Sequence, residues 1–477
     1  MYQYSLLDLS RALHAHEITS TELTHYFLNR INQSSILNAF ITVDEEKALQ
    51  DASHADHLLK TKKATRLTGI PLAHKDNLCT KNRLTTCGSK ILSTFNAPYN
   101  ATLVQKLHDK GAVLMGKTNL DEFAMGSSNE SSYFGPVKNP WDLDYVPGGS
   151  SGGSAAAIAA GLIPFATGSD TGGSIRQPAA FCGISGLKPT YGLISRMGLI
   201  AYASSLDQAG PMARSAESLA LVLEAMAGFD EQDSTSLDSK IPDYVQHLNA
   251  PLLGKKIGLP TDLLSEGIDE AIQQAVGQVA DFFRDQGAHI IPITLALTEQ
   301  WTPCYYLIAL AEASSNLSRY DGIRYGYRAK DADNWIELIR QTRTEGFGQE
   351  VKRRILAGTY FLSAEHHQAH FVQAQKVRHM IHDELNHHFK TLDFMLMPTT
   401  PTPAFCLNET DKSHIQDYAC DRFTVAANLA GLPALSIPAG FDPKTHLPLG
   451  VQLMGPAYSE SLLLNAAHLY QQATTWH

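Results

Sequence analysis

The sequence predicts an α/β layered fold. Short apolar runs with the length of buried strands, such as residues 112–115, are mixed with longer segments of helical periodicity, such as residues 269–287. Strand and helix signals alternate along the whole chain, and we find no tandem repeat. The chain has 477 residues, of which 44% are hydrophobic, so it is long enough to bury a large core.

The predicted elements follow one another in four parts. Residues 1–65 contain two amphipathic helices, and residues 66–230 contain the strand TGIPLAHKDN followed by stretches rich in Gly, Ser and Ala. Residues 231–395 are richer in charge and in residues that favour helices. Residues 396–477 contain the apolar segments LPALSIPAGF and LPLGVQLMGP, which we interpret as a pair of strands.

Charge and cysteine usage exclude several functional classes. The formal net charge is −10, which disfavours direct binding to nucleic acid or to an anionic membrane. The six cysteines form no C-x-x-C pair, the first residues do not resemble a signal peptide, and no apolar run reaches the roughly 18 residues of a membrane span. We therefore expect a soluble, cytoplasmic protein with reduced thiols.

Residues 111–118, GAVLMGKT, match the P-loop pattern G-x-x-x-x-G-K-[ST]. A true P-loop needs an open, glycine-rich loop, whereas the four variable positions here form an apolar run typical of a buried strand. We expect Gly111 to end a helix, residues 112–115 to form a strand and GKTN to follow it as a turn. A nucleotide-binding function through this segment is a remote alternative.

The stretch TGGSIRQPAA offers the clearest catalytic signal. It follows the apolar segment IPFATGSD, and Ser174 then opens a short helix with Pro178 in its first turns. The two glycines before Ser174 let the backbone approach a ligand closely, and N–H groups at a helix N-terminus can stabilise an oxyanion. Taken alone, an ordinary helix cap is the simpler interpretation.

A serine nucleophile needs a base, and Lys75 is a candidate at the end of a predicted strand. Burial would penalise the charged form of the lysine and lower its pKa. Ser150, in PGGSSGG, could relay a proton between Lys75 and a second serine. The simpler alternative for Lys75 is a surface lysine that pairs with Asp76.

Three other motifs compete with this interpretation. GSSGG matches the nucleophile elbow G-x-S-x-G with Ser151 as nucleophile, but no strand is predicted before it. SGLK, residues 185–188, matches a β-lactamase motif, but Pro189 argues against a helix there. His366 and His370 have the spacing of a metal-binding pair, but we find no third ligand, expect a polar helix face and predict no metal site.

Lys75, Ser150 and Ser174, with their flanking sequences, resemble the Ser–cisSer–Lys triad of the amidase signature family. The resemblance implies that Ser174 is the nucleophile and that Ser150, with a cis peptide bond to Ser151, bridges it to Lys75. It implies an oxyanion hole formed by backbone N–H groups of residues Thr171, Gly172, Gly173 and Ser174. It also implies a central mixed β-sheet covered by helices on both faces, in a single domain over residues 1–477.

Longer segments, such as TEGFGQEVKRRILAGTY and DYACDRFTVAANLAGLPALSIP, resemble the glutamine-hydrolysing subunits within this family that serve tRNA-dependent amidotransferases. The resemblance implies that Arg354 binds the α-carboxylate of glutamine and Asp421 its α-ammonium group, with Tyr305 and Ser128 lining the pocket. It implies a heterotrimer in which the C subunit joins this chain to the B subunit. The B subunit would hold the mischarged tRNA, ATP and Mg²⁺, and this chain would need no cofactor. A stand-alone amidase acting on another small amide is the main alternative.

Overall fold

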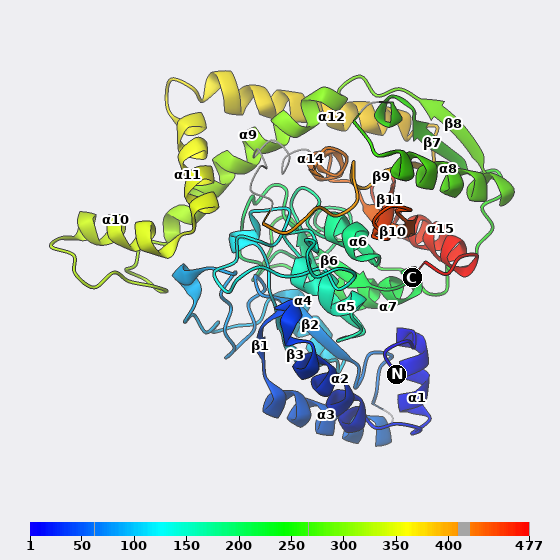
Figure 1. Ribbon diagram of the computed structural model, residues 1–477, viewed down its shortest axis with the longest axis horizontal. Coiled ribbons are helices and arrows are strands. Elements are labelled where there is room, and N and C mark those ends of the chain that lie inside the picture. Colours follow the sequence, from blue (N-terminus) through cyan, green and yellow to red (C-terminus); the bar gives the residue numbers. More distant parts are fainter. Residues whose placement is uncertain (62, 266, 409–419, 477) are drawn as a thin grey trace.

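The computed structural model describes residues 1–61, 63–265, 267–408 and 420–476 (Figure 1). The strands are β1 Phe40–Val43, β2 Pro71–Lys75, β3 Val113–Thr118, β4 Phe165–Asp170, β5 Ser185–Lys188, β6 Gln208–Ala213, β7 Lys256–Pro260, β8 His289–Ile293, β9 Phe394–Pro398, β10 Ala434–Phe441 and β11 Pro448–Met454. The helices are α1 Leu6–His14, α2 Ser20–Gln33, α3 Glu45–Lys60, α4 Thr102–Asp109, α5 Gly152–Ala159, α6 Arg176–Cys182, α7 Ala216–Met226, α8 Glu270–Asp285, α9 Thr298–Asn316, α10 Trp335–Gly346, α11 Gln349–Leu362, α12 Gln373–His388, α14 Val425–Leu429 and α15 Glu460–Gln472.

The strands form one mixed, 11-stranded sheet in the order β1-β3-β2-β4-β6-β5-β10-β11-β9-β7-β8. Strand β2 runs parallel to β3 and β4, and β7 runs parallel to β8 and β9, while the other pairs are antiparallel. The predicted α/β class and the predicted pairing of the two C-terminal segments, β10 and β11, are confirmed. The part predicted as mainly helical, residues 231–395, also supplies the edge strand β8 and its neighbour β7.

Helices cover both faces of the sheet. Every residue of β2 to β6, β9 and β11 is buried, as expected for strands that are packed on two sides. Two neighbouring residues of β5 show that a helix lies on each face of the sheet. Gly186 is so close to Ala179 of α6 that an added Cβ would lie 2.9 Å from the Ala179 Cβ. The hydroxyl of Ser185 accepts a 2.8 Å hydrogen bond from Gln471 of α15. Because successive side chains of a strand point to opposite faces, α6 and α15 lie on opposite sides of the sheet.

The segment that matches the P-loop pattern is a buried strand with a longer extent than expected. Strand β3 continues through Thr118, so Gly116 and Lys117 lie within it and no turn follows residue 115. Lys117 is buried, and its Nζ lies 2.8 Å from Asp76 Oδ1. This buried ion pair holds the lysine inside the sheet, which explains why the strand does not end where the apolar run ends. It also shows that Asp76 pairs with Lys117 rather than with Lys75.

The parallel strands β2, β3 and β4 place their carboxyl ends at one edge of the sheet, where α/β proteins commonly bind ligands. Helices α9 to α12 form a separate group in Figure 1, with α9 packed along both α11 and α12 and with α10 projecting outward. A second cluster of buried apolar side chains lies under this group. Among the described residues, no helix is both long and apolar enough to cross a membrane.

Candidate active site

Lys75 is the last residue of β2, and its side chain is completely buried. Its Nζ donates hydrogen bonds to the hydroxyls of Ser150 at 2.7 Å, Ser151 at 2.8 Å and Ser169 at 2.9 Å. Burial lowers the pKa of Lys75 to about 7, although nearby carboxylates such as Asp121 oppose this shift. The lysine is therefore a buried group that can exchange a proton near neutral pH, and not a surface residue.

Ser150 is completely buried and lies two residues before α5, next to the N-cap residue Ser151. A cis peptide bond joins Gly149 to Ser150, so the bond that we expected between Ser150 and Ser151 lies one residue earlier. Gly149 is the residue that can occupy this place, because an added Cβ would lie 2.1 Å from Asp121 Oδ2. The N–H of Ser151 donates to the Ser174 carbonyl at 3.2 Å, which ties the two serine-containing loops together.

Ser174 lies in the loop between β4 and α6 and, unlike Lys75 and Ser150, is partly exposed. The expectation that Ser174 opens the helix is wrong, because α6 begins at Arg176 with Ile175 as its N-cap residue. Pro178 lies in the first turn as expected. The structure therefore brings together the loops of all three predicted triad residues. Ser174 is partly exposed, whereas Lys75 and Ser150 are buried, and this arrangement suits a nucleophile at the surface of the site with a base beneath it.

The proposed oxyanion donors lie in the same loop, but their backbone groups are not equivalent. The Gly173 N–H donates to Asp170 Oδ1 at 2.8 Å in this conformation, so it is already engaged. Gly172 lies under the Tyr305 ring, where an added Cβ would come within 2.5 Å of the Tyr305 Cζ. The amides of Thr171, Gly172 and Ser174 remain our candidates for binding an oxyanion.

A buried ion pair braces this loop. Asp170, at the end of β4, lies 3.0 Å from the Arg176 guanidinium through each of its two oxygens. Both side chains are completely buried, and Asn428 contacts both of them. Burial alone would raise the pKa of Asp170, but Arg176 lowers it to about 2. The carboxylate therefore stays ionised and fixes the start of α6.

Arg354 is a buried residue of α11. Its Nε donates to Glu350 at 2.7 Å and its Nη1 donates to the Tyr202 hydroxyl at 2.8 Å. Its neighbour Arg353 also pairs with Glu350, but 37% of the Arg353 side chain is exposed, against 7% for Arg354. Arg354, rather than Arg353, therefore carries its charge into the interior of the molecule.

Asp421 is buried, and its pKa is raised by burial to about 7. Tyr306 donates to it at 2.7 Å and Ser127 at 3.2 Å. Sequence reasoning singled out Tyr305 and Ser128, each one position away from these partners. Successive residues of a helix point in directions about 100° apart, and no signal in the sequence distinguishes the two tyrosines.

The two residues that we singled out lie close by. Tyr305 packs on Gly172 beside the proposed nucleophile, and Ser128 is buried against Gly149. Both therefore line the region of the triad, while their neighbours Tyr306 and Ser127 contact Asp421.

The tyrosines connect the two charged residues. The Tyr306 ring lies 5.9 Å from Arg354 Cζ, and the hydroxyl of the same residue contacts Asp421. Tyr305 stacks edge-on against Tyr306 and reaches Gly172 on its other side. The site thus combines a serine–lysine centre with a cation and an anion held by one aromatic cluster. Such an arrangement can hydrolyse an amide while binding a second, zwitterionic part of the substrate.

Comparison with known proteins agrees with this chemistry. Residues 22–464 match the Amidase family. The chain belongs to the amidase family. The amidase is 59% identical over 477 residues to the glutamyl-tRNA(Gln) amidotransferase A subunit of Legionella pneumophila (strain Paris), covering all of this chain and 98% of that protein.

Two solved structures are similar over nearly the whole chain. The crystal structure of the glutamyl-tRNA(Gln) amidotransferase A subunit from Thermotoga maritima is 38% identical with a TM-score of 0.81, covering 98% of this amidase and 94% of that chain. Native peptide amidase from Stenotrophomonas maltophilia is 33% identical with a TM-score of 0.83, covering 99% and 97%. These similarities confirm the predicted family, its fold and its enzymatic class.

The rival motifs have structural roles in the amidase. Within residues 119–151, all of which the structure describes, no strand precedes Ser151, so GSSGG lacks the strand of a nucleophile elbow. Ser151 instead begins the turn into α5. SGLK is strand β5, in agreement with the expectation that Lys188 does not lie in a helix.

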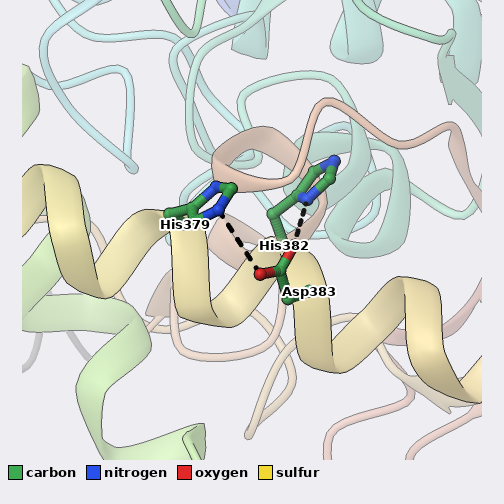
Figure 2. A group of neighbouring side chains, drawn as sticks. All are labelled: His379, His382 and Asp383. Carbon is green, nitrogen blue, oxygen red and sulfur yellow. Dashed lines mark hydrogen bonds and ion pairs between the residues drawn. The ribbon is translucent and has the colours of Figure 1, made fainter.

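A different histidine cluster comes together on the surface of the amidase. His379, His382 and Asp383 lie on α12 with ligand atoms within 4.8 Å of one another, and both imidazoles point to the carboxylate in Figure 2. All three are exposed. His366 and His370 instead pack against the Tyr360 ring in tilted orientations. Sequence reasoning missed the trio because it considered only one i, i+4 pair.

Proposed function

We propose that this amidase is the glutamine-hydrolysing subunit of a tRNA-dependent amidotransferase. The observation that supports this most directly is the pairing of the Lys75–Ser150 centre with two buried, oppositely charged residues, Arg354 and Asp421. Free glutamine carries an α-carboxylate and an α-ammonium group, so its pocket needs one cation and one anion. The full-length similarity to amidotransferase A subunits agrees with this assignment.

The arrangement of charges suits the substrate. The Arg354 guanidinium can bind the α-carboxylate with two parallel hydrogen bonds, and Asp421 can accept from the α-ammonium group. Binding the ammonium group would also stabilise the ionised form of Asp421, whose pKa burial raises. Tyr305 and Ser128, which lie beside the serine loops, would then line the path of the side-chain amide.

The reaction follows acyl-transfer chemistry. The Ser174 hydroxyl attacks the side-chain amide carbon, and its proton passes through Ser150 to neutral Lys75. The oxyanion accepts from the backbone amides of Thr171, Gly172 and Ser174. Lys75 then returns the proton through Ser150 to the departing nitrogen, which leaves as ammonia. Water attacks the acyl-enzyme, with the same lysine as base, and releases glutamate and the free serine.

Ammonia formed here would serve a second active site. We propose that the chain assembles with a B subunit, which binds the mischarged tRNA and uses ATP and Mg²⁺, and with a C subunit that joins them. Transfer of ammonia to Glu-tRNA(Gln), or to Asp-tRNA(Asn), would then take place on the B subunit. No cofactor is required by the steps assigned to this chain.

Ammonia release from glutamine tests the proposal, first with the chain alone and then with the chain co-expressed with the B and C subunits encoded in the same genome. We expect turnover that rises with the partners and is lost in Ser174→Ala. A panel of small amides and C-terminally amidated peptides serves as the comparison. Turnover that does not need the partners and prefers those amides would support a stand-alone amidase, resembling the peptide amidase structure, and would refute the proposal.

A further inference from the structure

Two consecutive carboxylates, Asp121 and Glu122, are buried beyond the end of β3 and have no role in the reaction steps above. Their side chains serve different parts of the molecule. Asp121 Oδ2 accepts from the Asn129 N–H at 2.9 Å, and Asp121 Oδ1 accepts from the Ser131 hydroxyl at 2.8 Å. Glu122 accepts from the Ser89 hydroxyl and from the Gly348 N–H.

Asp121 lies against the backbone that presents Ser150. A Cβ added at Gly149 would come within 2.1 Å of Asp121 Oδ2 and 2.9 Å of the Ser128 N. The carboxylate therefore fills the space under the peptide that leads into Ser150. Its hydrogen bonds also fix the loop that supplies Ser127 and Ser128.

Glu122 holds the start of α11. Gly348 is the N-cap residue of this helix, and its N–H donates to Glu122 Oε2 at 2.8 Å. A carboxylate at this end also interacts favourably with the helix dipole. The contact is tight, because a Cβ added at Gly348 would lie 2.3 Å from Glu122 Oε2. The backbone conformation does not itself require glycine, since the φ of −69° suits any residue. The next residues pack together as well, since the rings of Phe123 and Phe347 lie 5.7 Å apart.

Helix α11 connects Gly348, which Glu122 holds, to Arg354, the proposed substrate-binding residue. Arg354 lies six residues after Gly348, which is about 9 Å along the helix axis. Glu350, in the first turn, holds the Arg354 Nε at 2.7 Å. A shift or rotation at the start of α11 would therefore move Arg354 relative to Tyr202 and Asp421.

We propose that Glu122 is a positioning residue that anchors the start of α11, so that Arg354 faces the substrate carboxylate, while the adjacent Asp121 supports the Ser150 loop. The two halves of the site, one catalytic and one substrate-binding, thus meet at one dipeptide. This inference rests on the proposed function, because it uses the role given there to Arg354.

The test measures steady-state kinetics of the assembled enzyme with glutamine and with glutamine α-amide, which lacks the α-carboxylate. For Glu122→Ala we expect KM for glutamine to rise about tenfold or more with kcat changed less than about threefold, as for a loss of uniform binding. The kcat/KM for the α-amide should stay within about twofold of wild type. In an Arg354→Ala background, Glu122→Ala should add no further effect, since the two residues act in series.

Two further variants test the contact itself. In Glu122→Gln the amide oxygen can accept from Gly348 and the NH₂ group can donate to Ser89, so we expect KM within about threefold of wild type. Gly348→Ala places a methyl group against the carboxylate and should raise KM as Glu122→Ala does. Gly348→Ala also tests the anchor if Glu122→Ala does not fold. Asp269→Ala, which removes the carboxylate cap of α8, is the matched control and should leave both kinetic constants unchanged.

The outcomes separate the two hypotheses. If the wild-type enzyme hydrolyses glutamine but the Glu122 and Gly348 variants keep its KM, or lose activity equally with both substrates, the positioning role is wrong. If the wild-type enzyme does not hydrolyse glutamine at all, the proposed function is wrong, and with it the role of Arg354 on which this inference depends.

Discussion

The Lys75 Nζ and the Ser150 Oγ lie 2.7 Å apart, and both residues are completely buried. Three serine hydroxyls surround the same nitrogen, which is enough to saturate an ammonium group. When Lys75 loses a proton, its lone pair can accept from Ser150, which can then accept from the nucleophile. The geometry therefore supports a base that acts through a serine relay.

Removing the base should abolish most of the activity. Lys75→Ala and Lys75→Arg should both lower kcat by about 10²–10⁴-fold, because arginine keeps the positive charge but does not release its proton. The measurement is ammonia release from glutamine, with thermal unfolding as a check on the fold. Near-normal activity in Lys75→Arg would show that the residue does not act as a base.

Activity should rise with pH through about 7. The pKa of Lys75 is lowered by burial to about 7, and the amine accepts a proton only above that pH. Asp421 has its pKa raised by burial to about 7, and only its ionised form attracts the substrate ammonium group. Both effects have the same sign, so kcat/KM for glutamine should fall below pH 7 and level off above it. A profile that is flat between about pH 5.5 and about pH 8.5 would contradict these assignments.

Tyr306→Phe should move this profile to higher pH. The Tyr306 hydroxyl donates to Asp421 and so lowers the pKa of that carboxyl from the value that burial alone would give. Without the hydroxyl, a higher pH is needed to ionise Asp421, and KM for glutamine at pH 7 should increase. Tyr202→Phe is the comparison variant, because it removes a hydroxyl that accepts from the other charged residue, Arg354, and not one that donates to Asp421. An unchanged profile in Tyr306→Phe would show that Asp421 does not control binding.

The ion pair between Asp170 and Arg176 should matter for stability. Asp170→Asn leaves the buried guanidinium without its counter-charge, which costs about 3–5 kcal/mol in the free energy of unfolding. Chemical denaturation measures this loss, and Asp281→Asn, which breaks an exposed pair on α8, should have little effect. A loss as small as that of the control would show that the pair does not brace the loop.

The same ion pair predicts that the folded protein loses stability at low pH. The pKa of Asp170 is about 2 in the folded chain, below the ordinary value of about 3.9 expected when unfolded. Its contribution to stability is therefore complete above about pH 4 and is lost as the pH falls toward 2. Asp170→Asn should remove this part of the pH dependence of unfolding.

Lys117 should contribute to stability and not to nucleotide binding. Its Nζ is held by Asp76 and by the Leu78 carbonyl inside the sheet, so Lys117→Ala leaves a buried carboxylate without its partner and costs about 3–5 kcal/mol. ATP titration of the isolated chain, followed by calorimetry, should show no binding before or after the substitution. Tight binding that Lys117→Ala removes would restore the P-loop interpretation.

The sequence by itself determined much of the local structure and the position of the catalytic serines. Short, largely apolar segments predicted strands such as β2 and β10, because a strand that is packed on both faces buries nearly all its side chains. The Gly- and Ser-rich stretches marked the loops of Ser150 and Ser174, since only small residues allow backbones to approach so closely there. The resemblance to amidases then supplied the expected roles.

Only the tertiary structure decided which of two adjacent residues in the sequence makes a given contact. Pairing of strands far apart in the chain buried Lys75 among serines and gave Asp76 to Lys117, although Asp76 adjoins Lys75 in sequence. Packing of α9 selected Tyr306 over Tyr305 as the partner of Asp421. The contact of Glu122 with Gly348 spans 226 positions, and no local pattern encodes such a contact. These choices depend on which surfaces meet when the sheet and helices assemble, and that information is not local to any segment.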